Sequence, residues 1–134
     1  MHASSVRIAD HAVLVTGPSG SGKSSLCLEL MALGATLIAD DRTRLCEWDE
    51  KLWASAPKSL PQAIEARGVG LLRVRLAPAA PIGLVVDMGR NEEDRLPPER
   101  NILLQGHNVP LLRRSNTTHF AAAILLQMRG AWSQ

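Results

Sequence analysis

Short apolar runs separated by polar turns dominate the N-terminal part of the chain. Residues 3–8 and 12–16 are predicted strands, and a glycine-rich turn follows the second. Residues 24–33 carry leucines at helical spacing and end before Gly34, which suits a helix C-terminus. Residues 35–39 then have the composition of a buried strand. This order predicts a βαβ unit with a right-handed crossover and a locally parallel sheet.

Downstream, the pattern changes to shorter apolar runs. The polar turn after the first of them indicates a hairpin rather than a second βαβ unit. A last helix is predicted at 118–129, with Asn116 or Thr117 as its N-cap and an apolar face. We therefore expect an α/β fold in one domain, residues 1–134, whose sheet is mixed and largely antiparallel outside the βαβ unit. The further predicted strands are residues 43–48, 52–56, 71–76, 82–88, 101–105 and 109–112.

Composition and charge exclude some classes of function. Fifteen basic residues stand against thirteen acidic ones, giving a formal charge of +2, and they are dispersed along the chain. Such a dispersed and nearly neutral charge is not typical of proteins that bind nucleic acid. The few aromatic rings also argue against stacking of single-stranded bases. The apolar runs are shorter than the roughly 20 residues of a membrane span, and no signal segment begins the chain. We expect a cytoplasmic protein that binds neither nucleic acid nor membrane.

The strongest chemical signal lies between the second predicted strand and the first helix. There the chain fits the P-loop, or Walker A, pattern G-x-x-x-x-G-K-[ST]. Glycines let successive N–H groups converge on phosphates, and the helix N-terminus adds positive potential. Lys23 would contact the β- and γ-phosphates, and the Ser24 hydroxyl would ligate Mg²⁺. The predicted nucleotide-binding residues are Gly17, Pro18, Ser19, Gly20, Ser21, Gly22, Lys23 and Ser24.

An acidic pair, Asp40-Asp41, closes the strand that follows the helix. Ligands of open parallel sheets lie beyond the carboxyl ends of the strands, so these carboxylates should face the phosphates. One of them would hold Mg²⁺, directly or through water, or would accept the proton of an attacking hydroxyl. The alternative is an acidic surface turn, because Asp favours turns.

His2 becomes a candidate site residue only if the first two predicted strands pair as a hairpin. If residues 9–11 form the turn and Ile8 lies opposite Ala12, position 2 lies opposite position 18. That register places His2 beside the P-loop, where an imidazole could contact a phosphate. The alternative is a frayed terminal histidine.

Two later residues are weaker candidates on spacing alone. Glu65 begins the glycine-rich stretch E-A-R-G-V-G, which lies between a short helical or loop stretch and the next predicted strand. Its carboxylate could complete a Mg²⁺ site with Ser24, or it could lie in a solvated loop. Arg95, taken by itself, is an ordinary surface arginine.

In combination, these segments resemble the catalytic C-terminal domain of the HPr kinase/phosphorylases. The match rests on His2, the loop GPSGSGKS, LIADDR at 37–42, EARGVG at 65–70 and DRL at 94–96. It covers about residues 1–96 and is closest to the short alphaproteobacterial form. The resemblance implies a P-loop kinase core of the HPr kinase/PEP carboxykinase type, with a P-loop helix and a C-terminal helix.

The activity implied by the resemblance is ATP- and Mg²⁺-dependent phosphorylation of a serine on HPr, a small carrier protein of the sugar phosphotransferase system. Inorganic phosphate would drive the reverse reaction, and the family is hexameric. His2, Lys23, Asp40 and Arg95 match its catalytic residues. Asp40 would accept a proton in phosphorylation and return it in dephosphorylation, whereas Arg95 would act at the transferring phosphoryl group.

The metal ligands of the family match Ser24 and Glu65. Its proline/arginine/glycine segment near the C-terminus, associated with dephosphorylation, has no clean counterpart in residues 112–116. The rival hypotheses are a P-loop small-molecule kinase, which would usually continue through more βα units, and a regulatory module that binds ATP without transferring its phosphate.

Overall fold

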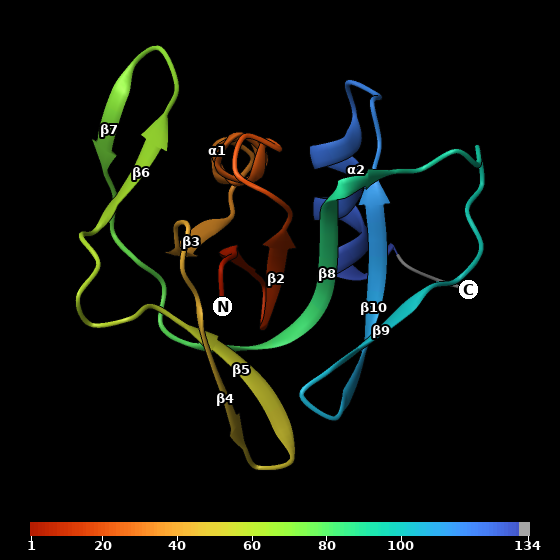
Figure 1. Ribbon diagram of the computed structural model, residues 1–134, viewed down its shortest axis with the longest axis horizontal. Coiled ribbons are helices and arrows are strands. Elements are labelled where there is room, and N and C mark those ends of the chain that lie inside the picture. The colour runs from red at the N-terminus through yellow and green to blue at the C-terminus, as the bar shows by residue number, and fades with distance from the viewer. Residues whose placement is uncertain (132–134) are drawn as a thin grey trace.

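The computed structural model describes residues 1–131 of the chain (Figure 1). The elements are β1 (Ser4–Ile8), β2 (His11–Thr16), α1 (Lys23–Ala32), β3 (Thr36–Ala39), β4 (Arg44–Trp48), β5 (Lys51–Ser55), β6 (Ala63–Ala66), β7 (Gly70–Arg73), β8 (Ala80–Asn91), β9 (Asn101–Leu104), β10 (His107–Arg114), α2 (Phe120–Leu126) and the irregular helical turn η1 (Gln127–Ala131).

The main sheet has the strand order β3-β1-β2-β8-β10-β9, and the β4–β5 hairpin joins it through β5 and β8. Only β2–β8 and β8–β10 are parallel pairs among the described strands. The remaining pairs are antiparallel. The α/β fold with a mixed, mostly antiparallel sheet, a P-loop helix and a C-terminal helix is thus confirmed.

The pairing within the first βαβ unit differs from the prediction. β1 lies between β2 and β3 and is antiparallel to both, so β2 and β3 run in the same direction without pairing. The parallel neighbour of β2 is β8 instead. A strand joined to β2 by a tight turn pairs with it locally, and β3 is left with the outer edge of β1.

The first hairpin is one residue tighter than predicted. Ile8 lies opposite His11, and a two-residue turn at Ala9 and Asp10, with a φ of 54° at Ala9, joins the strands. Ser4 therefore lies opposite Val15. The predicted register, with Ile8 opposite Ala12, was therefore wrong by one residue.

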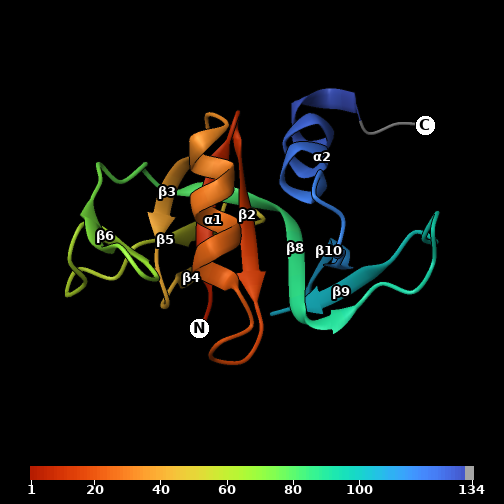
Figure 2. The same cartoon turned by 90° about the horizontal axis from the view of Figure 1, so that it is seen from above.

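Both helices pack on one face of the sheet and form the main core (Figure 2). The opposite face carries two smaller clusters, one around Leu14 and Val85 and the other around Ile38 and Ala54. The main cluster includes Val6, Val15, Leu84 and Val86 of the sheet, Leu26 and Leu30 of α1, and Ile124 of α2. None of the helices within residues 1–131 is long and apolar enough to cross a membrane.

α2 is shorter than the predicted helix and starts later. His119 is its N-cap, and no side chain caps it. The hydroxyls of Ser115 and Thr117 hydrogen-bond each other at 3.1 Å, and the Ser115 hydroxyl accepts from the Thr117 amide at 3.4 Å. These local bonds compete with capping, which explains why the Thr117 cap is not used.

The β6–β7 hairpin was predicted incorrectly as a helical or loop stretch followed by a strand. Ile64 and Ala66 are buried while Glu65 is exposed, which is the alternation of a half-buried strand. Positive φ angles at Gly68 and Gly70 turn the chain, as their density suggested. The hairpin extends beside α1 at one side of the molecule (Figure 1). It brings Glu65 towards the start of α1, as the contacts described below show.

Candidate active site

The P-loop connects β2 to α1 at the edge of the sheet where β2, β3 and β8 end. Gly22 caps α1 in the left-handed conformation, with φ 95°. The buried Lys23 ammonium donates to the carbonyls of Gly17 at 2.8 Å and Pro18 at 3.2 Å. The strand, loop and helix that the sequence motif requires are therefore present, and the lysine lies over the loop that would hold phosphates.

Gly17 is required by the close packing of this loop. Its φ is +140°, and an added Cβ would lie 2.6 Å from the Ser21 Oγ and 3.1 Å from the Gly89 backbone nitrogen. The end of β8 thus supports the P-loop from one side. A side chain at position 17 would displace either the loop or that strand.

Three elements converge on the carboxylate of Asp40, directly after β3. Its Oδ1 accepts from the Ser24 Oγ of α1 at 2.7 Å and from the Ser4 Oγ of β1 at 2.9 Å. Its Oδ2 accepts from the Glu65 backbone N–H of β6 at 3.2 Å. Asp40 is consequently oriented on both oxygens and lies beside the serine that ends the P-loop motif.

Ser4 reaches this site because β1 is antiparallel to its neighbours. The start of β1 lies at the edge where β2 and β3 end, so the Ser4 Oγ can donate to Asp40 and accept from the Asp41 N–H at 3.0 Å. Our sequence analysis missed Ser4. The hairpin register was the signal that could have found it.

Cys27 lies in the core below the carboxylate. Burial raises the pKa of its thiol far above the usual value, and the negative charge of Asp40 raises this pKa further. A thiol that stays protonated is a poor nucleophile and metal ligand. Cys27 is therefore not a candidate nucleophile or metal ligand of the site.

His2 lies beside Asp41 rather than opposite Pro18. The Met1 amino group donates to the Thr43 carbonyl at 2.9 Å, and the Thr43 N–H donates to the Met1 carbonyl at 3.0 Å. This clamp holds the N-terminus, so the terminal histidine is not frayed. The His2 Nε2 is 3.6 Å from the Asp41 Oδ1, and both side chains are more than half exposed.

A polar hollow of about 140 Å³ opens over the start of α1. Lys23, Ser24, Asp41, Glu65 and Arg67 contribute to its lining together with glycines and serines of the P-loop. The structure therefore brings together Lys23, Ser24 and Glu65, which the sequence had placed in one site. Arg67, the arginine of the EARG segment, was not recognised as a site residue from the sequence.

The donors present fit a magnesium ion that is bound together with a nucleotide. Mg²⁺ prefers oxygen ligands and is commonly held by one or two carboxylates and substrate phosphates rather than by an all-protein cage. Ser24, Asp40 and Glu65 supply a hydroxyl and carboxylates next to the P-loop. Among residues 1–131, no group of three or more His, Cys, Asp or Glu side chains could hold a metal without such a substrate.

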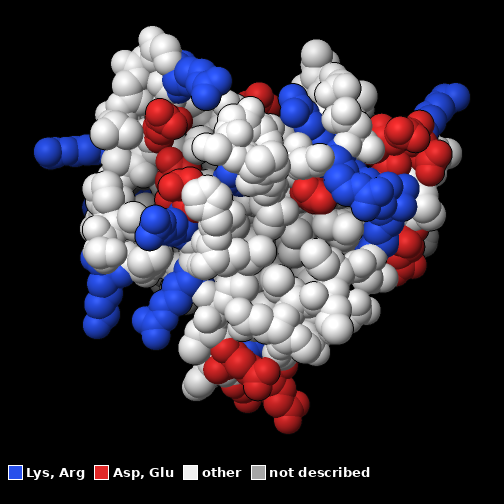
Figure 3. All heavy atoms as spheres, viewed as in Figure 1, with Lys and Arg blue, Asp and Glu red and all other residues white. Residues whose placement is uncertain are grey.

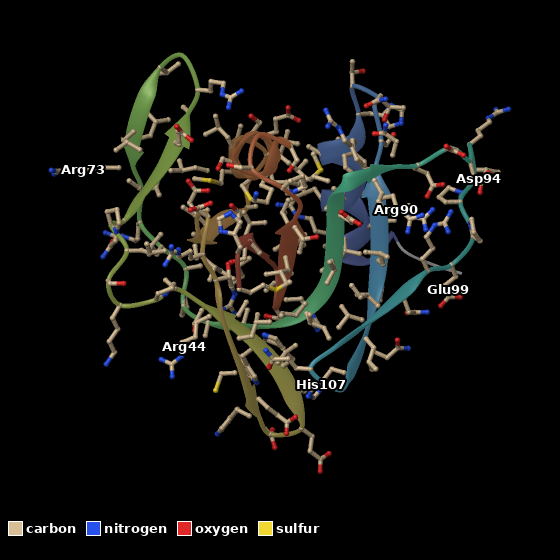
Figure 4. All side chains as sticks on the ribbon, viewed as in Figure 1. Arg44, Arg73, Arg90, Asp94, Glu99 and His107 are labelled. Carbon is tan, nitrogen blue, oxygen red and sulfur yellow. The ribbon has the colours of Figure 1, made fainter. Side chains whose placement is uncertain are left out.

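Arg95 is not brought to this group. It is exposed on the segment between β8 and β9, on the opposite side of the molecule from the β6–β7 hairpin (Figure 1). Its neighbour Asp94 lies at the outer edge of that segment (Figure 4). The segment is held by Arg100, whose Nη2 is 3.1 Å from the Glu92 Oε2 and 3.7 Å from the Asp94 Oδ2.

Two further polar residues near the P-loop were missed. Asp87 lies within β8, opposite Thr16 at the end of β2, and accepts from the Gly89 N–H at 2.8 Å. A carboxylate directly after a β-branched run was its signal. Arg114 donates to the Ser21 carbonyl at 3.4 Å.

Elsewhere, basic and acidic side chains are mixed over the face shown in Figure 3, as the near-neutral charge predicts.

The comparisons with known proteins agree with this geometry. The family model of the HPr Serine kinase C-terminal domain matches residues 1–94. The HPr kinase/phosphorylase of Limosilactobacillus reuteri is 38% identical over 96 residues, which are 66% of this chain and 30% of that protein. The HPr kinase/phosphorylase of Pediococcus pentosaceus is 43% identical over 75 residues, 55% of this chain and 24% of that protein.

A solved structure extends the likeness to nearly the whole fold. The HPr(Ser) kinase/phosphatase from Coxiella burnetii superposes with a TM-score of 0.80 at 25% sequence identity, covering 96% of this chain and 87% of that one. The chain spans less than a third of the length of the curated relatives it matches. With its P-loop, the aspartate after β3 and the hairpin that carries Glu65, this chain belongs to the family of the HPr serine kinase C-terminal domain.

Proposed function

We propose that this protein transfers the γ-phosphoryl group of ATP to a serine hydroxyl of HPr. The observation that carries the proposal is the Asp40 carboxylate, which hydrogen-bonds the P-loop Ser24 at 2.7 Å and is oriented by Ser4 and Glu65. A kinase needs such a carboxylate to accept the proton of the attacking hydroxyl next to the phosphate site. The names of the relatives support HPr as the acceptor.

Different residues bind the phosphates and accept the proton in the proposed reaction. The N–H groups of the P-loop and the Lys23 ammonium hold the phosphates as the serine oxygen attacks the γ-phosphorus. Asp40 takes the serine proton, the bond from the γ-phosphorus to the bridging oxygen breaks, and ADP leaves. Mg²⁺ held near Ser24 and Glu65 supplies neutralising positive charge to the phosphates when it is bound.

The same site is proposed to remove the phosphate from the serine again, with inorganic phosphate as the acceptor. In that direction a phosphate oxygen attacks the phosphoserine phosphorus, pyrophosphate forms, and protonated Asp40 returns its proton to the leaving serine oxygen. One carboxylate can serve both reactions because each exchanges a single proton with the same serine oxygen, taken up in phosphorylation and returned in dephosphorylation. The phosphorylase part of the relatives' names supports this second activity.

The remaining assignments rest on family resemblance. We assign His2 to the same site, next to Asp41, and Arg95 to the transferring phosphoryl group. We also propose that residues 1–134 act as one catalytic domain within a cytoplasmic homohexamer.

A phosphorylation assay tests the proposed function. The protein is incubated with Mg-ATP and HPr, and HPr is weighed by mass spectrometry. We expect serine-bound phosphate with the wild type and a rate about 10²- to 10³-fold lower with Asp40→Asn, while ATP affinity is retained. Asp49→Asn, in the exposed β4–β5 turn, is the matched control and should react like the wild type.

Two outcomes would redirect the proposal. Failure to phosphorylate HPr from any source, with ATP consumed on a small acceptor, would favour a small-molecule kinase. Tight ATP binding without turnover on any acceptor would indicate an ATP-sensing regulatory module.

A further inference from the structure

A second hollow adjoins the P-loop on the side away from Glu65. It lies between α1 and the segment that leads from β10 into α2, and its volume is about 340 Å³. Gly22 and Ser25 line both this hollow and the polar one over Lys23. The two hollows therefore meet at the first turn of α1, where the phosphates of a nucleotide would lie.

The lining of this second hollow differs from that of the first. Leu26, Met88 and Phe120 supply apolar surface, and they belong to the main core or pack against it. Polar side chains at its rim come from residues 114–117 and from Glu29. Small-molecule sites combine apolar walls with a few polar groups and have volumes from about 300 Å³ upward, so this hollow has the size and character of a nucleoside site.

The direction of the phosphate chain follows from the catalytic carboxylate. The γ-phosphate must lie near Asp40, whose hydrogen bonds to Ser24 and Glu65 place it by the polar hollow. Acidic side chains of that hollow, Asp41 and Glu65, favour Mg²⁺ and the acceptor hydroxyl over a nucleoside. The phosphate chain then extends across Gly22 and Ser25, and its other end reaches the hollow by Phe120.

We propose that the hollow between α1 and α2 binds the base and ribose of the nucleoside triphosphate. This proposal rests on the proposed function, because it assumes that the P-loop binds a nucleotide. The half-buried Phe120 presents a ring on which a base can stack. The Asn116 amide can both donate to and accept from a base edge, and the Glu29 carboxylate can accept from a ribose hydroxyl.

Arg114 lies where the two hollows meet. Its Nη1 donates to the P-loop carbonyl of Ser21 at 3.4 Å, and its side chain also lines the hollow. A guanidinium in this place faces both the phosphates and the nucleoside, which agrees with a nucleotide that passes from one hollow to the other.

The experiment measures the contribution of the nucleoside to binding separately from that of the phosphate chain. Binding of Mg-ATP and of Mg-tripolyphosphate, which has the phosphates without a nucleoside, is measured by calorimetry for the full chain. Phe120→Ala removes the ring, and Asn116→Trp fills the hollow from an exposed position, so it does not depend on the core. Leu103→Ala, on the exposed face of β9, is the control.

We expect the wild type to bind ATP at least tenfold more tightly than tripolyphosphate. Both hollow variants should lose about tenfold in ATP affinity and keep their tripolyphosphate affinity, and Leu103→Ala should bind both ligands like the wild type. Equal wild-type affinity for the two ligands would overturn the nucleoside site while leaving the proposed function intact. So would unchanged ATP affinity in Asn116→Trp, or parallel losses of both ligands in the variants.

A wrong acceptor can also be distinguished from a wrong nucleoside site. If the variants lose ATP affinity as expected but HPr is never phosphorylated, the nucleoside site stands and the proposed acceptor is wrong. If the wild type binds neither ligand, the nucleoside site and the P-loop assignment fall together.

Discussion

The Ser24 Oγ donates a 2.7 Å hydrogen bond to the Oδ1 of Asp40, which connects the first turn of α1 to the end of β3. The two residues are the last position of the P-loop motif and the first acid after the following strand. Because Ser4 donates to the same oxygen at 2.9 Å, the N-terminal strand becomes part of the site. The orientation of Asp40 therefore depends on the antiparallel placement of β1 between β2 and β3.

Ser4→Ala should slow phosphoryl transfer without weakening ATP binding. The change removes one donor to Asp40 and the acceptor of the Asp41 N–H, so the carboxylate loses part of its orientation. We expect kcat to fall about tenfold, equivalent to about 1.4 kcal/mol, with the KM for ATP nearly unchanged. Steady-state kinetics with HPr as acceptor measures both values.

The neighbouring serine is the matched control for this change. Ser5 is equally buried, but its hydroxyl bonds the Thr43 Oγ1 at 3.0 Å and not Asp40. Ser5→Ala should lower the free energy of unfolding by about 1 kcal/mol and leave kcat unchanged. Equal kinetic effects of the two variants would show that Ser4 acts only through the stability of β1.

Gly17→Ala and Gly20→Ala should separate two requirements of the P-loop. Both glycines have positive φ, so each substitution carries a backbone penalty on the order of 1 kcal/mol. Only at Gly17 would the new Cβ also meet the Ser21 Oγ at 2.6 Å and the backbone of β8, whereas Gly20 has open space. We expect Gly17→Ala to reduce Mg-ATP affinity more than tenfold and Gly20→Ala to reduce it less than threefold, as measured by calorimetry.

The sequence predicted those parts of the fold that are encoded locally. The P-loop, α1 and the strands around them follow from a motif and from leucine spacing within one continuous stretch. The β6–β7 hairpin was missed because β6 spans only Ala63–Ala66 and offers only Ile64 as a large apolar side chain. A strand this short carries too few alternations to be distinguished from a helix or loop.

Long-range pairing was harder to predict than local structure. The motif and the position of Asp40 predicted that Lys23, Ser24 and Asp40 would meet, but the insertion of β1 between β2 and β3 is a property of the whole sheet. The predicted register of the β1–β2 hairpin was wrong by one residue, and the contact of His2 with Asp41 could not be read from the sequence. The apolar face of the predicted C-terminal helix, by contrast, was a local signal, and it does supply Ile124 to the main core with Phe120 packed against it.

Arg95→Ala tests a residue for which resemblance and geometry give different positions. The arginine is exposed on the segment 92–100, and within residues 1–131 its side chain has no recorded ion pair or hydrogen bond. If it acts at the transferring phosphoryl group, kcat should fall about 10²-fold while the melting temperature stays the same. Kinetics and thermal unfolding of the same preparation measure both effects.

Arg100→Ala is the control on the same segment and should behave in the opposite way. Its hydrogen bond and charge lower the pKa of Glu92, so the pair stabilises the fold above the ordinary carboxyl pKa and loses this effect as the pH falls. The variant should melt earlier than the wild type at pH 7 and equally at pH 3, with less change in kcat than Arg95→Ala. A rate for Arg95→Ala within twofold of the wild type would remove Arg95 from the site.

Cys27 should make the stability of the protein fall at alkaline pH. Burial and the charge of Asp40 raise the pKa of its thiol, so the folded protein keeps the proton while the unfolded chain loses it above about pH 8.5. The unfolded state then binds fewer protons, and the free energy of unfolding falls by about 1.4 kcal/mol per pH unit from this residue. Cys27→Ala should lack this slope, and Cys46→Ala, at an exposed position, should retain it.

Urea unfolding at pH 8, 9 and 10 measures the difference in slope between the two cysteine variants, so that other alkaline titrations cancel. A thiol reagent provides an independent reading, because at pH 9 it should modify exposed Cys46 in the folded protein and reach Cys27 only after denaturation. Parallel pH profiles for both variants, or rapid modification of Cys27 in the folded state, would show that the thiolate forms within the native core beside Asp40.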